Sequence, residues 1–258
     1  MNSAVVARLR LLAGPNGSGK SFLVPLLAAE VNMGVSVNAD DIEATLKQQR
    51  RRNLRLLNLH DWNLQLTEDD LLHFRQGAGA QRLTPEQFVA FRMEQLYIEQ
   101  NVLLFQNTIL NSYVTAWVAE FLRFHLLASH QTLTFETVMS HRSKLDFLRT
   151  ARQQGYRTYL YYVATDDPSI NIGRVGARVA KGGHPVAADK IVERYTRSLD
   201  LLFDAIKLAD RAFLFDNSGD EPRLIAEITN GNKASFATTS VPKWVNTYFL
   251  AKAKPTEK

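Results

Sequence analysis

The chain has 258 residues, and its balance of 45% hydrophobic and 22% charged residues excludes a largely disordered protein. It contains no cysteine, which excludes a disulfide framework, a thiolate metal site and a cysteine nucleophile. The formal net charge of +5 leaves three interpretations open: a solvated basic surface, an acidic partner protein, or an anionic substrate such as a nucleic acid.

The N-terminal segment does not have the pattern of an export signal. Residues 1–13 contain Arg8 and Arg10 but no long apolar core. No stretch of the sequence approaches the ~20 apolar residues that a membrane helix needs. We therefore expect a cytoplasmic protein without a membrane-spanning segment.

A phosphate-binding motif follows the first apolar run, residues 8–14. The sequence AGPNGSGKS fits G-x-x-x-x-G-K-[ST], in which glycines let backbone N–H groups approach phosphate oxygens at the start of a helix. In this pattern Lys20 reaches the β- and γ-phosphates, and the Ser21 hydroxyl ligates Mg²⁺. Pro25 is expected to interrupt the helix that follows. We predict that a nucleoside triphosphate binds to Gly14, Pro15, Asn16, Gly17, Ser18, Gly19, Lys20 and Ser21.

Apolar runs and helical patterns alternate along the rest of the chain. After residues 8–14, four further runs are expected to be buried strands. Helical patterns separate them, for example at 143–156 and 188–209. This alternation predicts an α/β fold of P-loop NTPase type, a three-layer sandwich around a five-stranded, mostly parallel sheet. The four further strands are expected at 34–40, 132–138, 158–165 and 211–218.

The long gap between the second and third expected strands predicts a helical insertion over about 42–131. No linker marks an independent domain, so we expect residues 1–258 to form a single domain. Residues 224–237 are expected to form a hairpin whose turn contains Asn230–Gly231, and residues 241–252 a terminal helix. Within the insertion, helices are expected at 42–53, 67–75, 84–107 and 112–128.

Polar residues follow the second and third expected strands, where ligands bind in a doubly wound sheet. Asp40 or Asp41 is expected to accept a proton from an attacking hydroxyl, and both roles are met if Asp40 is the base and Asp41 caps a helix that begins near Ile42. The alternative is that these aspartates only cap. Glu136 either holds Mg²⁺ through water or orients the acceptor.

The residues after Glu136 are weaker candidates. His141 and Arg142 are interpreted as contacts to the phosphoryl acceptor, with ordinary surface residues as the alternative.

A cationic segment at 171–190 is interpreted as a lid. Arg174 and Arg178 are four residues apart and share one helix face, where like charges repel. Lys181 and the pair Gly182–Gly183 follow. A cationic helix joined to flexible glycines is suited to close over phosphates and stabilise the transferring group. The alternative is a solvated basic helix.

Two further stretches have open interpretations. Asp216 and Asn217 follow the fifth expected strand and either line the nucleotide or form an Asx turn with Gly219. The basic run at 47–55 is read first as a solvated helix face. An acidic protein partner and a nucleic acid are its alternatives.

Taken together, these stretches resemble the zeta-toxin family of P-loop kinases, and more closely its branch often labelled predicted ABC-type ATPase. The matching motifs include AGPNGSGKS, VNADDIE, LTFETVMSHRSKLDFLRTARQQGY and RAFLFDNS, within residues 11–218. A mechanical ATPase would need a strand ending in Asp–Glu and an LSGGQ-type signature, and the sequence has neither.

The resemblance implies a phosphotransferase that uses ATP or GTP with Mg²⁺ to phosphorylate a sugar hydroxyl of a nucleotide sugar such as UDP-N-acetylglucosamine. It implies that Lys20 and Ser21 occupy the phosphate and magnesium positions. Asp40 matches the aspartate that activates the hydroxyl, and Glu136 matches a glutamate of the substrate site. Arg178 matches one of two phosphate-clamping arginines. An antitoxin protein is the partner expected for a toxin of this kind.

The sequence also departs from the family pattern. The second clamping arginine falls near His184, so Lys181 or His184 would have to replace it. After the glutamate the chain reads Thr137–Val138, which changes the expected substrate contacts at Thr137. Two alternative functions remain: a kinase of polynucleotide ends or nucleotide cofactors, and a nucleotide-binding regulator with weak ATPase activity. Of these partners, nucleic acid is the less expected.

Overall fold

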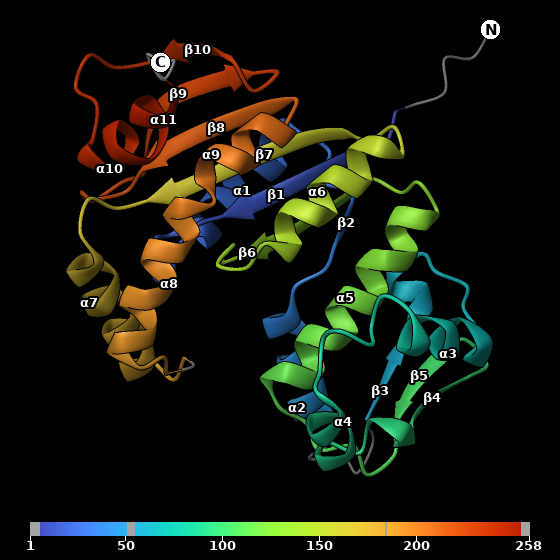
Figure 1. The fold of residues 1–258 in the computed structure, drawn as a ribbon. Helices are drawn as coiled ribbons and strands as arrows, with labels where there is room; N and C mark the ends of the chain where they lie inside the picture. Colours follow the sequence, from blue (N-terminus) through green and yellow to red (C-terminus); the bar gives the residue numbers. More distant parts are fainter. Residues whose placement is uncertain (1–5, 51–54, 184, 254–258) are drawn as a thin grey trace, which may run out of the picture. The chain divides into compact units, whose positions relative to one another are not determined.

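A computed structural model describes residues 6–50, 55–183 and 185–253 (Figure 1). The chain divides into two compact units. The first unit contains residues 1–33 and 134–258, and the second contains residues 34–133. Each unit is described by itself below.

A central sheet organises the first unit. Its strand order is β10-β9-β8-β7-β1-β6, so the strand that carries the phosphate motif lies between two others. β1, β7 and β8 run parallel, whereas β9 is antiparallel to both β8 and β10. The strands are β1 (Arg8–Ala13), β6 (Leu133–Thr137), β7 (Arg157–Ala164), β8 (Arg211–Asp216), β9 (Arg223–Thr229) and β10 (Lys233–Phe236).

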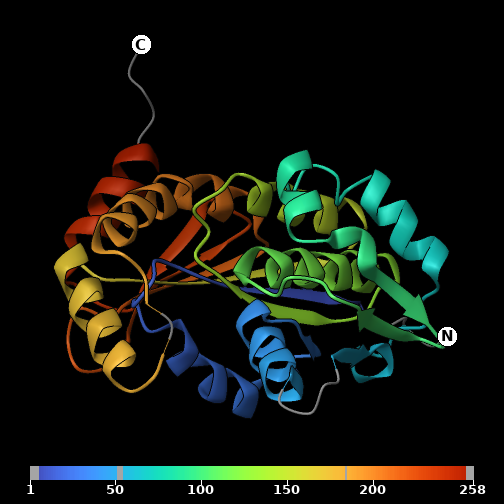
Figure 2. The same cartoon turned by 90° about the horizontal axis from the view of Figure 1, so that it is seen from below.

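Helices cover both faces of this sheet, as expected for a three-layer sandwich. Figure 2 shows α1 on one side of the sheet and the α8 and α9 helices on the other. The C-terminal helical segment consists of α10 (Lys243–Val245), a π-helical stretch (Asn246–Leu250) and α11 (Ala251–Ala253). The remaining helices are α1 (Lys20–Glu30), α6 (Ser143–Gln153), α7 (Pro168–Ala180), α8 (Ala188–Asp200) and α9 (Leu202–Leu208).

The α/β fold class predicted from the sequence is confirmed, but two details were wrong. The sheet has more than five strands, because the predicted hairpin at 224–237 joins it as β9 and β10 instead of standing apart. Its turn is the predicted one, with Asn230 and Gly231 both at positive φ. Pro25 does not end α1, which runs through it to Glu30.

The second unit combines helices with a small sheet of order β3-β5-β4. Its short first strand is tied to the segment before β6, because Val35 N donates to Thr132 O over 2.8 Å. The elements are β2 (Val35–Ser36), α2 (Ala39–Arg50), β3 (Leu56–Asn58), the 3-10 helix η1 (Leu59–Trp62), α3 (Glu68–Gln76), α4 (Pro85–Ala90), η2 (Met93–Gln95), β4 (Leu96–Glu99), β5 (Val102–Phe105) and α5 (Ser112–Ala128).

The helix predicted at 84–107 was wrong. Only α4 and η2 form there, and residues 96–105 make the β4–β5 hairpin. Its turn residues Gln100 and Asn101 both have positive φ, as a two-residue hairpin turn requires. The buried side chains follow a period of two, with Leu96 and Ile98 on one strand and Leu103 and Phe105 on the other. The insertion is therefore not purely helical.

The α5 helix forms the core of the second unit. Its bounds match the predicted 112–128, and Asn111 caps it by accepting from the backbone N–H groups of Tyr113 and Val114. Its buried face carries Trp117 and Phe121, which pack against Phe74 of α3. Although α5 is apolar, neither it nor any other helix in the described ranges has the length and hydropathy to cross a membrane.

Candidate nucleotide site

The phosphate motif forms a tight loop in which three glycines have no room for a side chain. Gly14, Gly17 and Gly19 all have positive φ values, of 142°, 74° and 93°. A Cβ at Gly14 would lie 2.0 Å from Val163 O. At Gly17 and Gly19 it would lie 2.6 Å from Asn171 O and 2.1 Å from the Asn217 amide nitrogen. Each glycine is thus fixed by a close neighbour and by its backbone conformation.

The start of α1 is arranged to receive an anion. Gly19 occupies the N-cap position, so no side chain caps the first N–H groups of the helix. The first turn contains no acidic residue that would compete for them. These amides and the positive end of the helix dipole therefore point toward the position a phosphate takes in a P-loop.

Lys20 and Ser21 place a cation and a hydroxyl at this helix start. Lys20 Nζ donates to Gly14 O over 2.8 Å and to Pro15 O over 3.0 Å, so its side chain folds back along the loop. Ser21 Oγ donates to Glu136 Oε2 over 3.0 Å. A hydroxyl beside a carboxylate supplies the oxygen ligands that Mg²⁺ prefers, and such sites need few protein groups. The donor set therefore fits a P-loop magnesium ion.

Glu136 ends the strand next to β1. The two strand ends are joined where Gly14 N donates to Thr137 O over 3.2 Å. Thr137 Oγ1 in turn accepts from Met139 N over 3.0 Å. Of the two roles considered for Glu136, its hydrogen bond to Ser21 favours the one beside magnesium.

Asn171, which the sequence did not reveal, secures the loop from the start of α7. Its side chain is completely buried, and its Nδ2 donates to Asn16 O over 2.6 Å. Its Oδ1 accepts from the Thr165 hydroxyl. Asp167 caps α7 and accepts from Ser169 N, and its hydrogen bonds with Ser169 lower the pKa of the Asp167 carboxyl. The first turns of α7 are thus fixed against the phosphate loop.

Asn217 secures the loop from the end of β8. Its Nδ2 donates to Ser18 O over 2.8 Å, and its backbone N donates to Ala164 O over 2.8 Å. Asn217 therefore contacts the phosphate loop itself. Its neighbour Asp216 is 7% exposed and accepts from Ser218 and Trp244, so the predicted Asx turn with Gly219 is replaced by contacts to these two residues.

The two arginines of the predicted lid have different surroundings. The guanidinium of Arg174 donates to two backbone carbonyls, Asn217 O and Gly219 O, over 2.7 Å each. It therefore stabilises the loop after β8. Arg178 lies on the exposed C-terminal half of α7, and the exposed Lys181 follows the helix as its C-cap residue. Gly182 there has φ of 89°, and Gly183 N donates to Arg178 O over 3.0 Å. The lid role of residues 171–190 stays a prediction, and His184 lies outside the described residues.

The two weaker candidates have local partners. His141 Nδ1 accepts from Ser143 N over 3.2 Å at the start of α6. Arg142 lies 3.7 Å from the Asp204 carboxylate of α9, with both side chains exposed. Their contact with an acceptor stays a prediction.

Asp40 lies in the second unit, in the first turn of α2. It is exposed, and its backbone N donates to Asn38 Oδ1 over 3.1 Å. The expectation that Asp41 caps a helix beginning near Ile42 was wrong. The helix begins at Ala39, and Asn38 supplies the capping oxygen and also accepts from Ile42 N. The catalytic role of Asp40 stays a prediction.

The family model of an AAA domain (AAA_33) matches residues 9–202, which is well over half of the chain. The chain belongs to this AAA domain family. The matched segment contains the phosphate loop, Glu136 and Arg178. It ends before Asp216 and Asn217, so the AAA domain match does not include the brace at the end of β8.

Similar proteins support the same fold. A chain from the PezAT chromosomal toxin–antitoxin system of Streptococcus pneumoniae superposes with a TM-score of 0.50 at 14% identity, covering 99% of this chain and 83% of that one. A structure of AvrRxo1-ORF1:AvrRxo1-ORF2 with sulphate ions also gives 0.50 at 14% identity, over 98% of this chain and 65% of the other. An uncharacterized protein of Haemophilus influenzae is 33% identical over 73 residues, which are 28% of this chain and 52% of that relative. The chain thus spans about half of that relative and less than two thirds of the AvrRxo1 chain. The predicted zeta-toxin-like P-loop kinase fold is confirmed.

The basic run at 47–55 is only partly described, since residues 51–54 lie outside the described ranges. Lys47 pairs with Glu43 over 2.5 Å, and Arg55 donates to Thr108 O over 3.0 Å. Lys47 and Arg55 are therefore engaged within their own unit.

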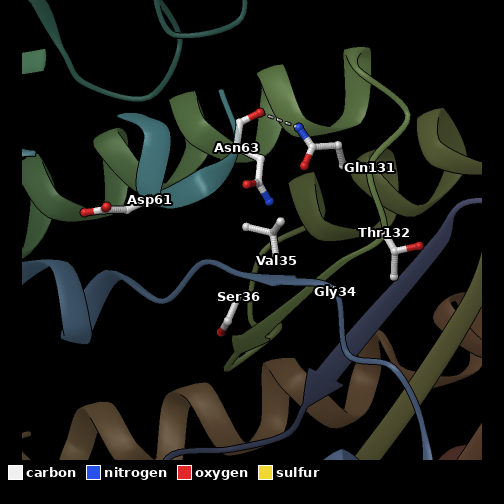
Figure 3. Close-up of a pocket in the computed structure, with 7 residues that line it drawn as sticks. All are labelled: Gly34, Val35, Ser36, Asp61, Asn63, Gln131 and Thr132. Atoms are coloured by element: carbon white, nitrogen blue, oxygen red, sulfur yellow. Dashed lines mark hydrogen bonds between the residues drawn. The ribbon is translucent and has the colours of Figure 1, made fainter. Parts of the chain in front are cut away.

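A polar hollow of about 600 Å³ lies in the second unit of this AAA domain protein (Figure 3). Gln131 Nε2 donates to Asn63 O at its edge over 2.9 Å, as Figure 3 shows. The hollow contains neither a phosphate-binding loop nor Asp40. The candidate nucleotide site is the phosphate loop, where the uncapped start of α1 and Lys20 lie together. The hollow is lined by Gly34, Val35, Ser36, Asp61, Asn63, Gln131 and Thr132.

Proposed function

We propose that this protein is a phosphotransferase that moves the γ-phosphoryl group of ATP or GTP to a hydroxyl of a small acceptor. The acceptor we favour is a sugar hydroxyl of a nucleotide sugar such as UDP-N-acetylglucosamine, in a toxin-type activity. The observation that carries the proposal is the hydrogen bond of 3.0 Å between Ser21 and Glu136 at the start of α1. This hydrogen bond places the carboxylate of Glu136, a group that can hold Mg²⁺, beside the phosphate loop that contains Lys20.

The residues of the site divide the reaction between them. The amides of the loop and Lys20 hold the β- and γ-phosphates. Ser21 and Glu136 would hold Mg²⁺, which when bound neutralises charge on the phosphates. Arg178 stabilises the negative charge that spreads over the transferring group. The γ-phosphorus bond to the nucleotide oxygen breaks as the acceptor oxygen bonds to phosphorus, and Asp40 accepts the hydroxyl proton.

The decisive experiment follows the label from γ-labelled ATP. The protein is incubated with Mg²⁺ and the labelled nucleotide, with UDP-N-acetylglucosamine or with a mixture of cell metabolites and RNA. We expect label on the nucleotide sugar. Label on RNA instead would favour a polynucleotide kinase, and release of free phosphate alone would favour a nucleotide-binding regulator.

The role of Asp40 has a matched control in its neighbour. Asp40→Ala should abolish transfer and leave the Kd for ATP within about twofold, since a general base acts on the acceptor and not on the nucleotide. Asp41→Ala removes an equally exposed carboxylate from the same helical turn and should leave transfer intact. Equal loss in both variants, or loss of ATP binding in Asp40→Ala, would contradict the assignment.

An antitoxin protein is the partner that this function implies. One chain of similar fold belongs to a toxin–antitoxin system, and another was solved in a two-protein complex. We infer that such a partner binds where it blocks the phosphate loop or the acceptor. Addition of ATP with Mg²⁺ should then compete with partner binding, and an affinity that ATP does not change would contradict this inference.

A further inference from the structure

The C-terminal helical segment contacts the residue that precedes Asn217. Trp244, at the start of α10, is 2% exposed, and its indole Nε1 donates to Asp216 Oδ1 over 3.0 Å. Its ring packs beside Tyr162 of β7, with centroids 6.0 Å apart. Trp244 N also lies 3.4 Å from Asp166 Oδ1. One tryptophan thus contacts the ends of both β7 and β8.

Asp216 and Ser218 enclose Asn217 in a network of hydrogen bonds. Ser218 Oγ donates to Asp216 Oδ1 over 2.8 Å, and Asp166 N donates to Ser218 Oγ over 2.8 Å. Asp216 is nearly buried, so its carboxylate depends on these donors and on Trp244 for its stabilisation. The residues on either side of Asn217 are therefore held in one position.

Asn217 connects this network to the nucleotide site. Its side-chain amide nitrogen donates to Ser18 O. A Cβ on Gly19 would collide with this same nitrogen. The Asn217 carbonyl accepts from Arg174 of α7. A shift of the turn after β8 would therefore move the phosphate loop and the anchored half of α7 together.

We propose that Trp244 and Asp216 are positioning residues of the nucleotide site, which they act on through Asn217. The inference rests on the proposed binding of ATP at the phosphate loop. The indole N–H holds the Asp216 carboxylate, which fixes the turn, and the turn presents Asn217 to Ser18. The C-terminal segment, beyond the part of the chain that matches the family model, is thus part of the nucleotide site.

The chain offers a matched pair of variants. Trp244→Phe keeps an aromatic ring beside Tyr162 but removes the donor to Asp216. Trp117→Phe makes the same change at a tryptophan that is also 2% exposed and donates to Gly79 O over 3.1 Å in the second unit. Both variants lose one buried indole hydrogen bond, so a purely structural role predicts the same result for both.

The measurement is the Kd for ATP with Mg²⁺ by titration calorimetry, with the melting temperature of each variant recorded beside it. We expect Trp244→Phe to weaken binding about tenfold and Trp117→Phe to leave it unchanged, although both lower the melting temperature. Asp216→Asn, which keeps an oxygen acceptor for the indole, should bind ATP within about threefold of the parent. Equal Kd values in Trp244→Phe and the parent would overturn the inference.

Fluorescence gives a second measurement that does not depend on how Trp244→Phe folds. The chain has three tryptophans, and Trp62 and Trp117 both belong to the second unit. In a Trp62→Phe/Trp117→Phe variant, Trp244 emission should shift on addition of ATP and Mg²⁺. ATP binding without a change in emission would contradict the coupling and leave the proposed function standing. No ATP binding to the parent protein would instead refute the proposed function.

Discussion

The glycines of the phosphate loop are all crowded, whereas those of the predicted lid are mixed, since a Cβ at Gly183 would lie 2.7 Å from Arg178 Cγ but others have open space. At Gly14, Gly17 and Gly19 an added Cβ would lie 2.0–2.6 Å from a neighbouring atom. At Gly176 and Gly182 it would meet nothing within 4 Å. The loop glycines let other groups approach the backbone, whereas Gly176 and Gly182 have room for a side chain. We therefore expect the loop to keep its shape when a nucleotide binds, and the predicted lid to adjust near these two glycines.

The same contrast divides α7 into two halves. Asn171 is buried and Arg174 is bonded to the loop after β8, while Arg178 lies on the exposed half. A helix fixed at its first turns and open at its last ones can move a cation toward a phosphate without disturbing the cradle.

The largest effect should come from the lysine of the rigid loop. Lys20→Ala removes the cation that holds the β- and γ-phosphates, and we expect transfer to fall by ~10³ and ATP affinity to fall with it. Lys181→Ala removes a candidate replacement for the second clamping arginine and should lower transfer by about tenfold at most, with the Kd for ATP within about threefold of the parent. Steady-state kinetics and calorimetry of both variants measure the difference. Equal losses would remove the distinction between the two regions.

The lid arginine should affect the rate more than the affinity. Arg178→Ala is expected to lower kcat by ~10² and to leave the Kd for ATP within about threefold, because its charge acts on the transferring group. Arg174→Ala should show the reverse pattern, with weaker ATP binding as the brace on Asn217 is lost. Kinetics at saturating ATP, beside calorimetry, separate these outcomes. A rise in Kd alone for Arg178→Ala would place that arginine outside the transfer step.

Gly19→Ala tests how rigid the phosphate loop is. The new Cβ would lie 2.1 Å from the Asn217 amide, and its φ of 93° disfavours any side chain. We expect a loss of about 1–3 kcal/mol in the free energy of unfolding and at least tenfold weaker ATP binding. Thermal melts and calorimetry measure both. An unchanged protein would mean that Asn217 moves aside without cost.

Gly176→Ala is the matched change in the lid and should have the smallest effect, with the opposite sign for stability. Its Cβ has open space and a helical backbone, so alanine should stabilise α7 by about 0.5–1 kcal/mol. A stiffer helix should slow transfer by no more than about threefold. A melting temperature that falls instead would show that the open half of α7 is packed in solution.

Sequence reasoning succeeded where the determining contacts are local. The loop from Gly14 to Ser21 follows from one motif, and the bounds of α5 follow from its helical pattern at 112–128. It failed at 96–105, where apolar residues are so frequent that a period of two was read as a helix. The turn at Gln100 and Asn101 was the signal that distinguishes a hairpin from a helix in this stretch, although both residue types also occur within helices.

The two asparagines that hold the loop were harder to predict. Asn171 bonds to a residue 155 positions away, and Asn217 to one 199 positions away. No local pattern encodes such a contact, since either residue is equally typical of a cap or a turn. Asn217 was named as a candidate only because it follows a strand. Arg174 was read as a phosphate ligand from its charge, whereas its fork geometry matches two carbonyls.

The position of β8 also bears on how much of the chain must be made for the protein to be stable. The family match ends at residue 202, before the strand that carries Asn217 and before the hairpin that pairs with it. A shortened protein that ends there would keep the whole phosphate motif, yet it would expose the edge of β7 and lack one support of its own loop. We therefore expect the smallest autonomous form of this protein to extend through Trp244, well past the region that matches the family model.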